Sequence, residues 1–131
     1  MILLDTCAIL WDALDRSQLS PKALKGIDRA DQHSALIMSD ISIWEIAMLV
    51  KKGRIEIDTS PANFVNLFLQ ARNISVVQIS PEIAELSIQF GTDISNDPAD
   101  RLIAATSIIY NAQLVTADTS LLDSDMVDTL W

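Results

Sequence analysis

The sequence contains only one cysteine, Cys7, and only one histidine, His33, among its 131 residues. One cysteine cannot form a disulfide within the chain, and one histidine leaves no pair that could share a zinc ion. The three glycines, Gly26, Gly53 and Gly91, stand far apart. A phosphate-binding or dinucleotide-binding loop needs clustered glycines, so the sequence argues against both.

Long apolar runs and targeting signals are also missing. No apolar stretch approaches the roughly 20 residues of a membrane span, and the start, Met1 to Asp5, lacks the basic region of a secretory signal. Half of the residues are nevertheless hydrophobic, which is enough for one well-packed core. We therefore expect a single domain over residues 1–131, in the reducing cytoplasm and without membrane contact.

Basic residues are scarce as well. Nine Lys and Arg stand against eighteen Asp and Glu, giving a net charge of −9 that disfavours binding of a phosphate backbone by a basic surface. Three explanations of the acids stay open: a site in which bound divalent metal offsets them, a surface for a basic protein partner, or solubility alone. Solubility explains most of the acids whatever the function.

Short apolar runs alternate with helical patterns along the chain. Strands are predicted at 1–4, 35–38, 74–79 and 113–116, with a short edge strand within 126–131; helices are predicted at 7–14, 21–30, 41–52, from Pro61, from Pro81 through Phe90, and from Pro98, with a short turn or helix at 119–122. Strands separated by helices at this spacing predict an α/β fold with a parallel sheet covered on both faces.

Four acids from remote stretches could share one crevice of this fold. Asp5 and Asp118 each follow a predicted strand, and ligands of such folds collect at the carboxyl ends of the strands. Glu45 and Asp100 lie on helices that could reach the same crevice. Each acid also has a structural explanation, because Asp5 could cap a helix and Glu45 could belong to a polar stripe.

Several carboxylates crowded together would take up protons unless a hard cation held them. Oxygen-only ligands select Mg²⁺ or Mn²⁺ over zinc. Two such ions about 4 Å apart can activate water and stabilise the leaving oxygen of a phosphodiester. A metal site would therefore reconcile an acidic protein with a polyanionic substrate.

Four segments, at 2–6, 42–46, 97–105 and 114–118, in that order resemble PIN-domain ribonucleases, particularly toxins of the virulence-associated protein C (VapC) type. The resemblance implies a three-layer α/β/α sandwich with a central parallel sheet, and an Mg²⁺- or Mn²⁺-dependent endoribonuclease. It implies that Asp5, Glu45, Asp100 and Asp118 are the catalytic and metal-binding residues. It also implies an RNA substrate, a cognate antitoxin and a homodimer.

Further residues take secondary roles in this interpretation. Thr116 matches the family's small hydroxyl beside the last acid, Thr6 is a second auxiliary hydroxyl, and Asp97 is a helix cap first and an auxiliary ligand second. Arg101 could steer a phosphate or pair with Asp97. The basic cluster Lys51, Lys52 and Arg54 could contact RNA or form a solvated helix end. Ser95, Asn96 and Ala99 depart from the family pattern, and these departures affect substrate contacts.

Other function classes fit less well. A phosphoacceptor receiver domain needs a lysine on a late strand, and no lysine occurs after Lys52. Serine or cysteine hydrolysis lacks a suitable histidine. The remaining alternative is a non-catalytic PIN-like interaction module that keeps the fold without turnover.

Overall fold

The computed structural model describes every residue from Met1 to Trp131. Its centre is a sheet of five strands in the order β3-β2-β1-β4-β5, and every neighbouring pair is parallel. The strands are β1 Ile2–Leu4, β2 Leu36–Ser39, β3 Ile74–Val77, β4 Gln113–Val115 and β5 Thr129–Leu130. The predicted parallel sheet is confirmed. Because β1 and β4 are neighbours, the strand order changes direction between them.

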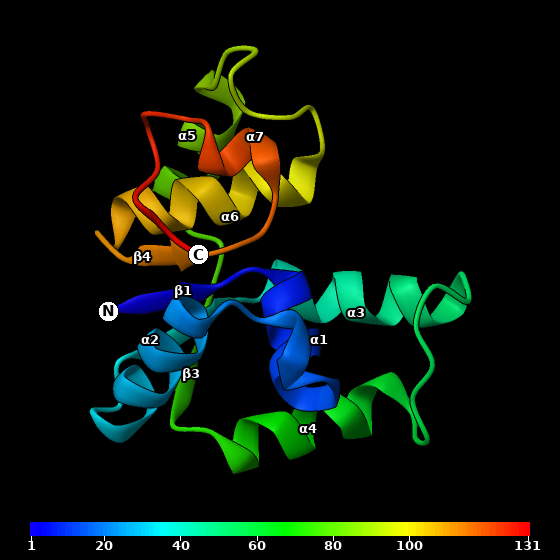
Figure 1. Cartoon of the computed structure of the whole chain (residues 1–131). Coiled ribbons are helices and arrows are strands. Elements are labelled where there is room, and N and C mark those ends of the chain that lie inside the picture. Colours follow the sequence, from blue (N-terminus) through cyan, green and yellow to red (C-terminus); the bar gives the residue numbers. More distant parts are fainter.

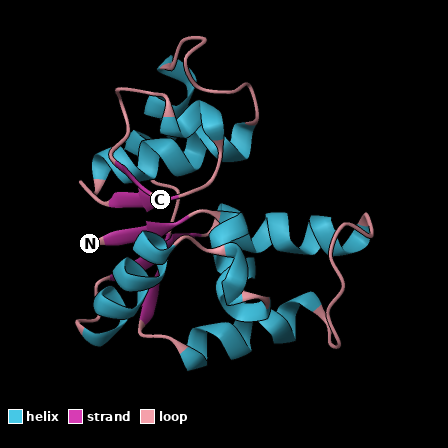
Figure 2. Cartoon of the chain, in the orientation of Figure 1, coloured by secondary structure: helices cyan, strands magenta, loops and turns pink.

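Helices cover both faces of the sheet, as Figures 1 and 2 show. They are α1 Thr6–Leu14, α2 Pro21–Gln32, α3 Ile41–Lys51, α4 Pro61–Ala71, α5 Pro81–Gln89, α6 Pro98–Ile109 and α7 Thr119–Leu122, with a short 3-10 helix at Arg16–Gln18. In the view of Figure 1, α5, α6 and α7 lie above the sheet, and α1, α2 and α4 lie below it. The predicted three-layer α/β/α architecture is confirmed.

The strands separate two hydrophobic cores, since successive side chains of a strand point to opposite faces. Leu3 and Leu114 belong to the core under α5, α6 and α7, whereas Leu4 and Val115 belong to the core under α1, α2 and α4. All four side chains are fully buried. Burial on both faces explains why the strands appear in the sequence as continuous apolar runs rather than as alternating patterns.

Local sequence signals set most helix starts. Three helices begin at a Ser-Pro pair, in which the serine hydroxyl accepts a hydrogen bond from a first-turn amide: Ser20 from Ala23 at 3.1 Å, Ser60 from Asn63 at 3.1 Å and Ser80 from Ile83 at 3.2 Å. At the end of α3, Gly53 adopts a φ of 72°, the left-handed conformation that glycine tolerates best.

Most element boundaries lie within one or two residues of the sequence prediction. The third strand ends at Val77 rather than Ile79, because the Ile79 amide donates to the Asp40 carboxylate at 3.3 Å. The side chain of Asp40, directly before α3, makes no cap hydrogen bond; the Ser39 hydroxyl accepts from the Ile41 amide at 3.3 Å instead. The closing strand predicted within 126–131 is the two-residue strand β5, Thr129–Leu130. None of the helices combines the length and apolar character that a membrane span requires.

An ion-pair network that the sequence analysis did not predict ties α1 to the end of α4. The Asp12 carboxylate is fully buried and accepts from Arg72 Nε at 2.9 Å and Nη2 at 2.6 Å, and from Arg16 Nε at 3.2 Å. Arg72 also reaches Asp31 of α2 at 3.3 Å. Removing one member of a buried pair leaves the other charge uncompensated, which is costly.

We predict that Asp12→Ala lowers the free energy of unfolding by about 3 kcal/mol, because it removes the one fully buried carboxylate of Arg72 and leaves the guanidinium only the partly exposed Asp31 and Asp28. Urea unfolding followed by circular dichroism measures the change. The matched control is Asp28→Ala, which removes a half-exposed carboxylate 2.7 Å from Arg16 and 3.5 Å from Arg72, and which should cost less than about 1 kcal/mol. Equal effects of the two substitutions would contradict the buried-pair explanation.

Candidate functional site

Five acidic side chains from four separate stretches line one cavity of about 360 Å³. They are Asp5, Glu45, Asp97, Asp100 and Asp118, and Thr6, Cys7, Trp11, Leu49 and Ala117 complete the wall. The cavity lies at the carboxyl ends of β1 and β4, where the strand order changes direction. All four acids predicted from the sequence to form the site are therefore brought together, with Asp97 beside them.

Asp5 follows β1 directly and is only 7% exposed. Its Oδ1 accepts from the Thr6 amide at 2.7 Å, and its Oδ2 accepts from the Thr116 hydroxyl at 2.7 Å. Thr116 Oγ1 in turn accepts from the Asp118 amide at 3.0 Å. Asp5 thus caps α1 and faces the cavity at once, so the two explanations of this residue are compatible. Thr116 links the ends of the two central strands.

A chain of hydroxyl groups holds Glu45. Thr6 Oγ1 donates to Glu45 Oε1 at 2.5 Å and lies 2.9 Å from Ser42 Oγ. A hydroxyl has one proton, so while Glu45 is ionised and accepts from Thr6, Ser42 is the donor to Thr6. Ser42 is fully buried one turn before Glu45, and the sequence analysis assigned it no role in the site. Its spacing of three residues from Glu45 on one helix was the available signal.

The other three acids begin helices. Asp97 Oδ1 accepts from the Ala99 amide at 3.2 Å, which makes it the cap of α6. Asp118 Oδ1 accepts from the Ser120 and Leu121 amides, which makes it the cap of α7. No hydrogen bond engages Oδ2 of either residue, so each keeps one oxygen for a ligand. Asp100, in the first turn of α6, accepts from the Ser95 hydroxyl at 2.8 Å.

Burial and mutual repulsion disfavour the charged forms of these acids. Burial raises the pKa of Glu45 to about 7 despite the hydrogen bond from Thr6, and nearby carboxylates add to the rise. Burial likewise raises the pKa of Asp100 to about 6 and that of Asp5 above its usual range. The cavity therefore favours any bound positive charge.

The residues present fit a hard divalent cation. Carboxylate oxygens face the cavity, and burial raises the pKa of the Cys7 thiol to about 11, so it stays protonated and is a poor ligand at neutral pH. No three acidic, histidine or cysteine side chains are arranged closely enough to enclose an ion. Mg²⁺ typically binds one or two carboxylates and completes its shell with water and substrate phosphates, which suits an open site.

Arg101 does not take either of its predicted roles. It makes no ion pair with Asp97, and all of its N–H groups are engaged by the segment before α6. The contacts are to the carbonyl oxygens of Ser95 and Phe90 at 2.8 Å, Gly91 at 2.9 Å and Ser87 and Ile94 at 3.4 Å, and to Asn96 Oδ1 at 3.4 Å. No donor is left for a phosphate. Arg101 instead shapes the loop from which Ser95 contacts Asp100.

The basic cluster lies at the far end of α3. Lys51, Lys52 and Arg54 are exposed and make no ion pair. Lys52 lines a second cavity, of about 420 Å³, whose wall also contains Trp44 of α3. This cavity shares Glu45 and Asp97 with the acidic one, so the two lie side by side. The sequence analysis did not predict the second cavity.

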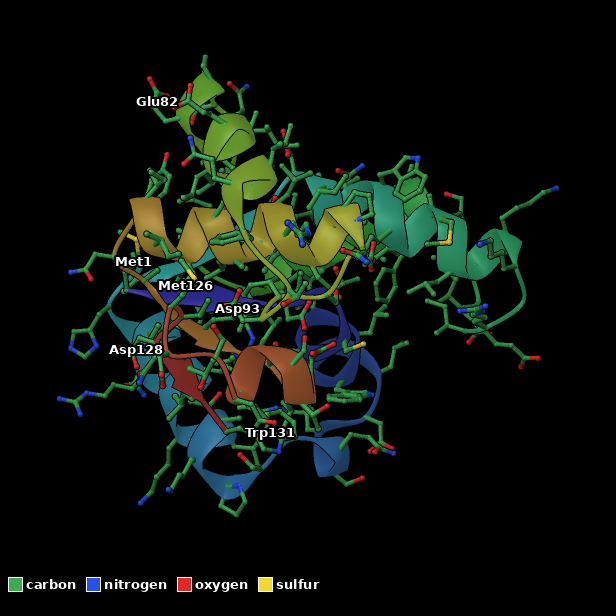
Figure 3. The ribbon with its side chains drawn as sticks, turned by 90° about the horizontal axis from the view of Figure 1, so that it is seen from above. Met1, Glu82, Asp93, Met126, Asp128 and Trp131 are labelled. Carbon is green, nitrogen blue, oxygen red and sulfur yellow. The ribbon has the colours of Figure 1, made fainter.

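Trp131 supports the wall of the acidic cavity from outside. It follows β5, at the position labelled in Figure 3. Its ring lies 5.7 Å from the ring of Trp11, at a tilt of 48°. Aromatic pairs in such an arrangement stabilise by about 0.5–1.5 kcal/mol beyond their burial. The edge strand β5 thereby steadies α1, which carries Thr6 into the site.

Comparisons with known proteins agree with this geometry. The sequence profile of the PIN domain matches residues 2–125. Ribonuclease VapC22 of Mycobacterium tuberculosis (strain ATCC 25618 / H37Rv) is 32% identical over 120 residues, which cover 92% of this chain and 88% of that protein.

Solved structures share the fold at lower identity. VapBC2 from Rickettsia felis, bound to a DNA fragment from its promoter, has a TM-score of 0.73 at 18% identity, covering 98% of this chain and 97% of that chain. A toxin-antitoxin complex from Klebsiella pneumoniae has a TM-score of 0.65 at 21% identity, covering 97% and 95%. FitAcB from Neisseria gonorrhoeae has a TM-score of 0.64 at 22% identity, covering 98% and 96%.

We predict that Glu45→Gln stabilises the metal-free protein at pH 8 and much less at pH 5. The raised pKa means that the folded state binds the Glu45 proton more tightly than the unfolded state, so stability falls as pH rises from about 4.5 through 7. A neutral side chain removes that loss, on the order of 1 kcal/mol because solvent screens the cavity.

Thermal unfolding in EDTA at both pH values measures the difference. The control is Glu56→Gln, which neutralises an exposed glutamate outside the cavity and should change the melting temperature little at either pH. A stabilisation by Glu45→Gln that is equal at pH 5 and pH 8 would rule out the titration of Glu45 as its cause.

Proposed function

This chain belongs to the PIN domain family, and we propose that it is a metal-dependent endoribonuclease acting as the toxin of a type II toxin–antitoxin pair. One observation carries the proposal: a cavity lined by five carboxylates at the sheet's change of direction, in a chain 32% identical to a protein named a ribonuclease. The proposed catalytic residues are Asp5, Glu45, Asp100 and Asp118.

In this proposal one or two of the four acids would bind Mg²⁺ or Mn²⁺ directly and the others would act through its water shell; the ion would supply positive charge for the phosphate and lower the pKa of a bound water. Asp5 is oriented by Thr116, and Glu45 is oriented by Thr6, so both carboxylates present a fixed face to the cavity. Asp97 contributes its Oδ2 as an auxiliary ligand.

Glu45 suits a role in proton transfer. Burial raises the pKa of Glu45 to about 7 in the metal-free cavity, and a bound cation would lower it, so Glu45 would be an ionised proton acceptor near neutral pH. In hydrolysis the water oxygen bonds to phosphorus, the bond from phosphorus to one ribose oxygen breaks, and a proton passes to that leaving oxygen. Glu45 can take the proton of the water, and solvent in the open cavity can return one to the leaving oxygen.

The second candidate is a PIN-like interaction module without turnover. It is favoured by the absence of three side chains arranged to enclose an ion. The two functions differ in turnover, because an interaction module, with or without bound metal, would cut no RNA. Calorimetric titration with Mn²⁺ alongside a cleavage assay separates them.

The proposal also includes partners. The Klebsiella pneumoniae neighbour is a toxin-antitoxin complex, and a chain of this fold with a ribonuclease activity would need such a partner to protect its own cell. We therefore propose a cognate antitoxin, a homodimer and a cytoplasmic location, where RNA is available.

We predict that Asp100→Asn lowers the rate of RNA cleavage in Mn²⁺ by at least about 100-fold, ~2.7 kcal/mol of transition-state stabilisation. Asparagine keeps an acceptor for Ser95 while removing the charge, so the circular dichroism spectrum should not change. Asp5→Asn should likewise lower the cleavage rate without changing the circular dichroism spectrum. Asp125→Asn, at an exposed acid outside the cavity, is the matched control and should cut at the wild-type rate.

Excess EDTA should stop the wild-type reaction, and added Mn²⁺ should restore it. Cutting that persists in EDTA would show that the acids do not act through a metal. In bacterial cells, induced wild-type chain should arrest growth, whereas Asp100→Asn should not.

We predict that the purified chain is a dimer. Light scattering during gel filtration should give twice the 14.4 kDa of one chain at micromolar concentration. A mass of 14.4 kDa over the whole concentration range would remove the homodimer from the proposal without affecting the cleavage prediction.

A further inference from the structure

The second cavity has a composition unlike that of the acidic one. Its wall is made by Ile41, Trp44, Met48, Lys52, Pro98 and Ala99, together with the shared acids Glu45 and Asp97. It lies between α3 and the start of α6, and its volume is about 420 Å³. An apolar cavity with one cation on its wall therefore opens directly beside the acidic cavity.

Trp44 is the notable side chain of this cavity. It is 60% exposed, in a chain in which aromatic residues are only 5% of the total. Trp44, Met48 and Lys52 are spaced four residues apart, so they form one stripe along α3. An exposed indole beside a thioether is a flat apolar surface, and Lys52 provides a positive charge at its end.

The stripe runs away from the proposed catalytic centre. Glu45 and Lys52 are seven residues apart, which is about 10.5 Å along a helix. A polymer whose phosphate lies at the acids could therefore lay its next nucleotide over Trp44 and bring a further phosphate to Lys52. Nucleobases stack on exposed aromatic rings regardless of their identity.

We propose that the second cavity binds a nucleobase of the RNA substrate, stacked on Trp44 and Met48, with a flanking phosphate at Lys52. This rests on the proposed function, because it takes the acidic cavity as the place of the cleaved phosphate. A base is favoured over a second copy of the chain because the cavity shares two wall residues with that site. The charge distribution also agrees with a phosphate at Lys52, since Lys52 is the one cation on the walls of either cavity.

The test measures binding separately from cleavage. The probe is a fluorescein-labelled 12-nucleotide single-stranded RNA, with fluorescence anisotropy read in Ca²⁺ on the Asp100→Asn background. Trp44→Ala should weaken binding by about 5- to 150-fold, the range of one base stacked on an aromatic ring, and Trp44→Phe should restore most of the affinity. Ile88→Ala, at a residue of α5 that is 82% exposed, is the control and should bind as the parent does.

A second comparison identifies the base itself. A series of probes carries one abasic nucleotide, each at a different position. At one position the missing base should weaken binding to the protein that has Trp44 but leave binding to Trp44→Ala unchanged. In Mn²⁺, on the otherwise wild-type chain, Trp44→Ala should raise KM more than it lowers kcat, and calorimetry should give an unchanged Mn²⁺ affinity.

Two results would overturn the nucleobase site. One is an affinity of Trp44→Ala for the probe within twofold of its parent. The other is a loss of dimer in Trp44→Ala by light scattering, which would identify the indole as a contact between copies. Failure of the proposed function gives a different result from failure of the nucleobase site, because the wild-type chain would then cut no RNA in Mn²⁺. The anisotropy and abasic-probe measurements would still decide whether Trp44 binds a base.

Discussion

The pairing of β1 with β4 is the constraint on which the rest of the structure depends. It sets Leu4 beside Val115, and the next residues of both strands then meet: the Thr116 hydroxyl donates to Asp5 across 111 residues of sequence. The same hydroxyl accepts from the Asp118 amide. One buried side chain thus fixes the separation of two acids and the start of α7. Without that register, the carboxylates would come from unrelated parts of the surface.

The acids in turn oppose the stability of the fold that gathers them. Burial and repulsion raise the pKa values of Asp5, Glu45 and Asp100, so at neutral pH the folded chain carries charge in an unfavourable place. The two cores and the Asp12–Arg72 pair offset this cost elsewhere. Local destabilisation that is compensated by the rest of the molecule is typical of functional sites.

Local sequence signals explain what could be predicted. Ser-Pro pairs, Asp97-Pro98 and short apolar runs depend on neighbouring residues only, so the helices, the strands and the parallel sheet followed from them. The placement of Asp5 and Asp118 followed from a general rule of parallel sheets. The pair of Asp12 with Arg72 was not predictable in this way, because 60 residues separate its members. The cavity at Trp44 was missed because it forms only where α3 approaches the start of α6.

Arg101 shows why a residue's chemistry does not reveal its role. A guanidinium beside a proposed catalytic acid is a natural phosphate ligand, but here its N–H groups donate to the loop before α6. That leaves Lys52 as the cation on the walls of the two cavities, in a chain of net charge −9. Under the proposed function, the side chains of these walls would neutralise few phosphates, so counterion release there would contribute little to RNA binding. Affinity would then come from bound metal and from stacking, both close to the cleaved bond rather than along the polymer.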